Sequence, residues 1–155
     1  MTFLSALREL WDNRILISAM SAWAAAQIIK TFLYAAMNGS INWRRLTGDG
    51  GMPSGHSAAV TAAAVVAAIR CGFGSAEFAI LALLASIVMH DACGVRRETG
   101  KQAAVIQDIV HALNLLAEKT YTPPQKLKLF VGHTPLQVFC GCLLGIFVGI
   151  LFGVL

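Results

Sequence analysis

Charged residues are scarce in this chain. Asp, Glu, Lys and Arg together make up 13% of its 155 residues, whereas a soluble domain carries about a quarter. Hydrophobic residues make up 57%, and they are gathered in blocks. This composition excludes an ordinary soluble domain. The length limits the chain to one domain, which we take to be a single integral-membrane domain over residues 1–155.

The chain also lacks the cysteine spacing of a metal site. Its four cysteines, Cys71, Cys93, Cys140 and Cys142, form no pair of the kind that zinc sites use. They are best interpreted as small buried hydrophobic residues. Internal repeats and low-complexity tracts are absent as well, apart from an alanine-rich stretch at residues 53–69.

Four apolar blocks lie at residues 15–37, 53–69, 76–95 and 135–155. A helix needs about 20 apolar residues to cross a bilayer, and the second block is shorter and only marginally hydrophobic. We therefore predict an all-α membrane bundle of about four transmembrane helices. Residues 7–11 are too short and too charged for a signal-peptide core, so residues 2–12 are predicted to form an interfacial helix.

Two further helical patterns concern packing. Apolar residues recur at helical spacing over residues 102–119, with polar residues on the other face, which predicts a helix on the membrane surface or a lid over the site. In the last block, four glycines recur every four residues: Gly141, Gly145, Gly149 and Gly153. Such a stripe permits close helix contact, within the chain or in a homo-oligomer.

The basic residues favour one side of the membrane. If the four blocks alternate across the bilayer, three Lys and Arg residues lie on the side of the termini and eight on the side of residues 38–52 and 96–134. The second side is therefore predicted to be cytoplasmic, in a bacterial plasma membrane. The net charge of +4 suits anionic lipid headgroups, and no nucleic-acid partner is expected.

The same alternation gathers polar residues at one face. These residues lie in or beside apolar helices, where polar groups are costly unless they line a cavity: Lys30, Arg44, Arg45, His56, Asp91, Arg96, Arg97 and His133. Cations and two helix N-termini make an anion site, and two histidines supply a nucleophile and an acid. Snorkelling of Lys30 and a simple ion pair between Asp91 and a neighbouring arginine are the alternatives.

The glycine-rich residues 50–57 open the second block. Glycines, a proline and small residues at a helix start present free backbone N–H groups to an anion, and His56 adds a proton donor there. A plain turn followed by a helix cap would show the same residue pattern. The octet on its own therefore leaves the choice open between a phosphate site and a cap.

Three motifs in order resemble the type-2 phosphatidic acid phosphatase superfamily, which includes the vanadium haloperoxidases. They lie at residues 51–58, at residues 91–97 with 100–103, and at residues 132–138 with Gly141 and Gly145. The similarity is greatest to the divergent, haloperoxidase-related branch of small membrane proteins, and it runs from about residue 22 to residue 150.

The resemblance implies a metal-independent phosphatase without a cofactor that acts on a membrane lipid phosphate through a phosphohistidine. His133 would attack phosphorus and His56 would protonate the leaving oxygen. The phosphoryl oxygens would be bound by Lys30, Arg44, Arg45, Ser54, Gly55, Arg96 and Arg97. Guanidinium groups suit this role because they bind phosphate through two hydrogen bonds.

The sequence departs from the family pattern at two positions. The arginine expected six residues before the nucleophile is Leu127, and the carboxylate expected four residues after it is Gln137. A glutamine can orient an imidazole but supplies no charge, so Asp91 becomes the candidate carboxylate. Two functions therefore remain: a lipid-phosphate phosphatase, or a catalytically weak or inactive protein that binds an anionic headgroup.

Overall fold

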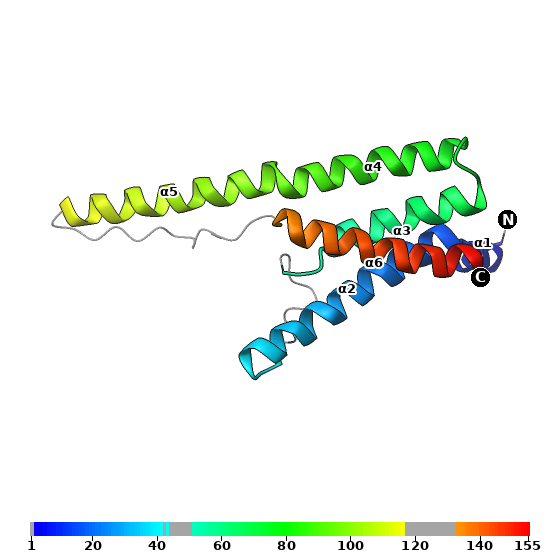
Figure 1. Ribbon diagram of the computed structural model, residues 1–155, viewed down its shortest axis with the longest axis horizontal. Coiled ribbons are helices and arrows are strands. Elements are labelled where there is room, and N and C mark those ends of the chain that lie inside the picture. Colours follow the sequence, from blue (N-terminus) through cyan, green and yellow to red (C-terminus); the bar gives the residue numbers. More distant parts are fainter. Residues whose placement is uncertain (1, 42, 44–50, 117–132) are drawn as a thin grey trace.

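The computed structural model describes residues 2–41, 43, 51–116 and 133–155. In these residues the fold is all-helical, as predicted. The helices are α1 (Phe3–Asp12), α2 (Arg14–Asn38), α3 (Gly55–Arg70), α4 (Ala76–Cys93), α5 (Val95–Leu116) and α6 (Pro135–Val154). Helices α2, α3, α4 and α6 form a bundle, with both termini at the end of the bundle where α3 turns into α4 (Figure 1).

Three helical runs are long and apolar enough to cross a membrane: Arg14–Asn38, Ala76–Leu115 and Pro135–Val154. Helix α3 has 16 residues, about 24 Å at 1.5 Å per residue, which is short of the ~30 Å hydrocarbon core. It nevertheless packs against all three of the others. A fourth crossing by α3 therefore stays a prediction, and its place inside the bundle supports it.

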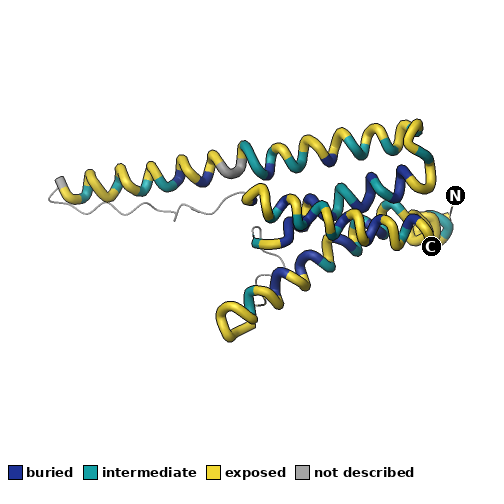
Figure 2. The backbone as a smooth tube through the Cα atoms, in the orientation of Figure 1, coloured by how far each residue is buried: buried dark blue, intermediate teal, exposed yellow. Residues whose placement is uncertain are grey.

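Small residues explain why α3 takes the central position. Ala58, Ala62, Val66 and Ala67 are fully buried, and buried residues run along the length of the helix (Figure 2). Without a hydrophobic driving force between helices in lipid, close van der Waals packing of small side chains holds such a bundle together. The alanine content that makes α3 only marginally hydrophobic is what lets three helices approach it.

The glycine stripe of α6 lies against α3 of the same chain. A Cβ atom on Gly145, Gly149 or Gly153 would come within 2.5–2.7 Å of an α3 atom, and one on Gly141 would lie 2.5 Å from the carbonyl oxygen of Ser54, the N-cap of α3. All four are buried. Of the two alternatives that the sequence left open for this stripe, close contact within the chain is the one that the structure shows, because α3 occupies the surface of the four glycines.

We expect Gly145→Val to destabilise the bundle strongly. A Cβ at this position would lie 2.5 Å from the Ala58 carbonyl oxygen, and overpacking of a tight contact costs about 1–3 kcal/mol. Gly74→Val is the matched control, because a Cβ at Gly74 meets nothing within 4 Å. The melting temperatures of the two variants in detergent test this. Equal melting temperatures would contradict the contact between α3 and α6.

Helix α5 does not cover the bundle. It continues the line of α4 away from the other helices (Figure 1), and α4 is the one described element against which it packs. Of the two alternatives for residues 102–119, a lid over the site is therefore wrong for the part of that segment that the structure describes, and a location on the membrane surface stays a prediction. Gly94, the single residue between the two helices, does not redirect the chain. Periodicity established the helix but not its direction.

The predicted N-terminal helix is α1. Thr2 caps it, and the Thr2 hydroxyl accepts a hydrogen bond from the backbone N–H of Ser5. Phe3 and Trp11 are both more than three-quarters exposed. An amphipathic helix with large exposed apolar side chains suits a membrane interface, and its location there stays a prediction.

Candidate functional site

The ends of three helices are tied together at one end of the bundle. The backbone N–H of Ser54, before α3, donates to the Gln137 carbonyl in α6 over 2.9 Å. The backbone N–H of His133, before α6, donates to the Ala92 carbonyl near the end of α4 over 3.0 Å. These bonds fix the starts of α3 and α6 beside the end of α4, where the sequence predicted that they meet.

His133 is buried at this junction and its ring is held by Gln137. The imidazole Nδ1 lies 3.1 Å from Gln137 Oε1, and the side chain is 7% exposed. Gln137 is the third residue of α6, in a capping box with Thr134. The same Oε1 atom accepts the backbone N–H of Thr134 over 3.1 Å.

This double contact determines which ring nitrogen of His133 carries the proton. A backbone N–H can only donate, so the atom of Gln137 that faces it must be the amide oxygen. An oxygen that faces Nδ1 requires Nδ1 to be the donor, and the neutral ring then carries its lone pair on Nε2. The capping box of α6 thus holds the ring and leaves the lone pair of the neutral imidazole on Nε2.

Lys30 is buried in α2, and Gly51 packs on its side chain. Its side chain is 4% exposed. Gly51 has a φ of +86°, and a Cβ there would lie 3.1 Å from Lys30 Cγ. The backbone of Gly51 therefore packs on the alkyl part of the Lys30 side chain. A buried cation in a membrane bundle is costly, and such residues mark functional sites.

Ser54 and Gly55 form the start of α3. Ser54 is fully buried, and its hydroxyl accepts hydrogen bonds from Ser57 N and Ser57 Oγ. A Cβ on Gly55 would lie 3.2 Å from the Trp23 ring and 3.3 Å from Gln27 Nε2. The structure thus shows a cap and a close approach to α2. Phosphate binding by these two residues stays a prediction.

Gln27 is a residue that the sequence analysis did not place in the site. It lies on α2 one turn before Lys30, 8% exposed, and its Oε1 has no hydrogen-bond partner among the described residues. A buried amide oxygen is costly unless a donor reaches it, so Gln27 joins Lys30 as a candidate residue of the site. The signal in the sequence was a second polar residue at helical spacing from a buried lysine.

For the other predicted site residues that the structure describes, it shows where they lie in the helices. His56 lies in the first turn of α3 with an exposed side chain, and Asp91 is half-buried beside Ala92. The backbone of Arg96 and Arg97 begins α5, but their side chains lie outside the described residues, as do Arg44 and Arg45. Among the described residues, no three His, Cys, Asp or Glu side chains are grouped to hold a metal ion.

Residues 11–148 match the family described as the divergent PAP2 family. The chain belongs to this family. It is also 40% identical over 146 residues to the Bacillus subtilis (strain 168) protein named "Uncharacterized membrane protein YuiD", a match that covers 89% of this chain and 92% of the relative. No solved structure matches the chain. Together with its apolar helices, this relationship identifies the chain as an integral membrane protein with a PAP2-like domain.

Proposed function

We propose that this PAP2-like protein hydrolyses a lipid phosphomonoester through a phosphohistidine on His133. The observation that carries the proposal is the pair of hydrogen bonds on Gln137 Oε1, which leaves the lone pair of the neutral ring on His133 Nε2. A buried imidazole with a fixed tautomer at a helix start is suited to nucleophilic attack.

In this mechanism His133 Nε2 forms a bond to phosphorus while the bond from phosphorus to the lipid oxygen breaks. His56 in its protonated form donates a proton to that leaving oxygen. Lys30 and the N-terminus of α3 neutralise the charge on the phosphoryl oxygens. Water then attacks phosphorus, the nitrogen–phosphorus bond breaks, and inorganic phosphate leaves while His56 takes up a proton.

The second candidate function is binding of an anionic headgroup without turnover. It is favoured by one observation: the group that contacts His133 Nδ1 is a neutral amide. Transfer of the phosphoryl group makes the imidazole ring positive, and a carboxylate would stabilise that charge better than an amide. The backbone N–H of His133 bonds to Ala92. Asp91 directly precedes Ala92, so it is the described carboxylate nearest to that bond along the chain.

Trapping of the intermediate separates the two functions. Purified protein is mixed with a short-chain phosphatidate labelled with ³²P, quenched with base and digested. We expect label on His133, stable to base and lost in acid, together with release of inorganic phosphate. Binding of the labelled lipid with neither label on His133 nor phosphate release would establish the second function in place of the first.

The active-site end is proposed to face the cytoplasm, from the excess of basic residues on that side. The native Cys71 is exposed in the turn between α3 and α4, at the opposite end of the bundle. We expect an impermeant thiol reagent to label Cys71 in intact cells. In a Cys71→Ser background, Ser40→Cys in the segment after α2 should be labelled only after permeabilisation. The reverse pattern would overturn the orientation.

A further inference from the structure

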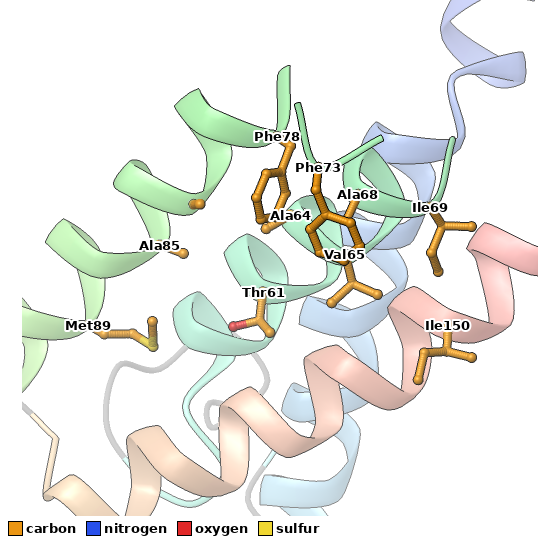
Figure 3. A pocket seen from close by; sticks show the side chains of 11 residues that line it. Thr61, Ala64, Val65, Ala68, Ile69, Phe73, Phe78, Ala85, Met89 and Ile150 are labelled. Carbon is orange, nitrogen blue, oxygen red and sulfur yellow. The ribbon is translucent and has the colours of Figure 1, made fainter. Parts of the chain in front are cut away.

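An apolar groove lies over α3, with α4 along one side and Ile150 of α6 on the other (Figure 3). Both helices pack extensively on α3 but make few contacts with each other. The space between them is about 430 Å³. Its floor is formed by α3, where Ala64 and Ala68 leave room, and Ala85 of α4 forms part of one wall. Small side chains on both helices therefore create the width of the groove.

Aromatic rings and sulfur atoms mark the two ends of the groove. Phe73 and Phe78 pack edge to face at the end away from His133, with ring centroids 5.1 Å apart. At the other end Met89 contacts Cys142 of α6, with the sulfur atoms 2.9 Å apart. From Phe78 to Met89 helix α4 rises about 17 Å, close to half of the ~30 Å hydrocarbon core.

The groove leads toward the candidate site. Met89 precedes Ala92 by three residues, about 4.5 Å along the helix, and the Ala92 carbonyl accepts the backbone N–H of His133. The flexible Met89 side chain can move aside for a hydrocarbon chain that passes from the candidate site into the groove. A lipid with its phosphate at His133 would therefore have its tail directed into the groove.

We propose that this groove binds one extended hydrocarbon chain of the lipid whose phosphate lies at His133. The proposal rests on the proposed function for the position of the headgroup. Its occupant follows from the location of the groove between apolar helices of a membrane bundle, where hydrocarbon is the surrounding medium. The volume divided over about 17 Å gives a mean cross-section of about 25 Å², which is room for one chain.

The groove lining is almost entirely apolar, which supports a hydrocarbon occupant. Thr61 has the one side-chain oxygen among the lining residues, and every other lining side chain is a hydrocarbon or a thioether. We therefore expect Thr61→Val, which removes the hydroxyl and keeps the shape, to leave chain binding unchanged or tighter. Weaker binding would mean that a polar group occupies this depth and would overturn the proposal.

The main test measures binding rather than turnover. Monoalkyl phosphates from hexyl to octadecyl are titrated into the purified protein and bound adducts are counted by native mass spectrometry. Ala85→Leu fills the groove, and we expect it to weaken binding of the long chains about tenfold while hexyl phosphate binds as before. Ala79→Leu is the matched control, because Ala79 is exposed on the same helix. It should bind every chain length as the wild type does.

The outcomes separate this proposal from the proposed function. The groove is supported if long chains bind more tightly than short ones in the wild type and in Ala79→Leu but not in Ala85→Leu. This holds even if the protein hydrolyses nothing. Equal long-chain binding in wild type and Ala85→Leu overturns the groove, even if phosphate is released. A dimer mass that replaces the lipid adduct would also overturn it. If Ala85→Leu does not fold, Ala68→Leu narrows the same groove from α3 and is judged by the same criteria.

Discussion

His133→Ala is expected to abolish phosphate release from a short-chain lipid phosphate. The substitution removes the nitrogen that would bond to phosphorus, and loss of a covalent nucleophile lowers turnover on the order of 10⁴-fold or more. It leaves the backbone bond from His133 to Ala92 in place, so the junction of α4 and α6 should persist. Initial rates of phosphate release and melting temperatures in detergent measure both effects.

Two other variants make this result specific. His111→Ala removes an exposed histidine of α5 and should retain wild-type turnover. His133→Asn keeps a side-chain N–H that can donate to Gln137 Oε1, so it should fold like the wild type and still be inactive. Full activity in His133→Ala would eliminate the phosphohistidine mechanism, whatever the activity of the controls.

The sequence predicted the elements that depend on composition along the chain. Apolar blocks located α2, α4 and α6, and Thr134 and Pro135 marked the start of α6, because a capping hydroxyl and a proline are local signals. Alternation of the helices then predicted that the ends meet where His133 and Ala92 are now seen to be bonded. These inferences succeed because each depends on neighbouring residues and on one simple rule of topology.

What the sequence did not predict depends on contacts between distant residues. A glycine stripe shows that a helix comes close, but not which helix, and α3 of the same chain was the answer for Gly145. Periodicity predicted the helix at residues 102–119 but could not show that it runs on from α4. The groove also escaped prediction, since it exists because α4 and α6 share α3 without closing on each other.

Gln137 is the residue whose meaning changed most. In the sequence it is a departure, a neutral side chain where a carboxylate is expected. In the structure its amide oxygen accepts from both Thr134 N and His133 Nδ1, so it caps α6 and also orients the His133 ring, the proposed nucleophile. Orientation is thus provided by the amide, and only the negative charge is missing.

Gln137→Glu is therefore expected to retain or raise turnover. A glutamate can accept the same two hydrogen bonds, and a glutamate at the third position of a helix is favoured in a capping box. Its charge would stabilise the imidazole ring as it becomes positive. If that is worth about 1.4 kcal/mol in the transition state, kcat rises about tenfold. Single-turnover kinetics with a short-chain phosphatidate provide the measurement.

Two comparisons show whether charge or orientation is responsible. Gln137→Met keeps the length of the side chain but accepts no comparable hydrogen bond, so we expect turnover to fall about 10²-fold or more as the ring loses its fixed tautomer. His111→Glu adds a negative charge at an exposed position of α5, outside the three motifs, and should change nothing. Turnover that survives in Gln137→Met would contradict the orienting role. An inactive wild type restored by Gln137→Glu would instead identify a site that binds its anion and has lost only the charge needed for catalysis.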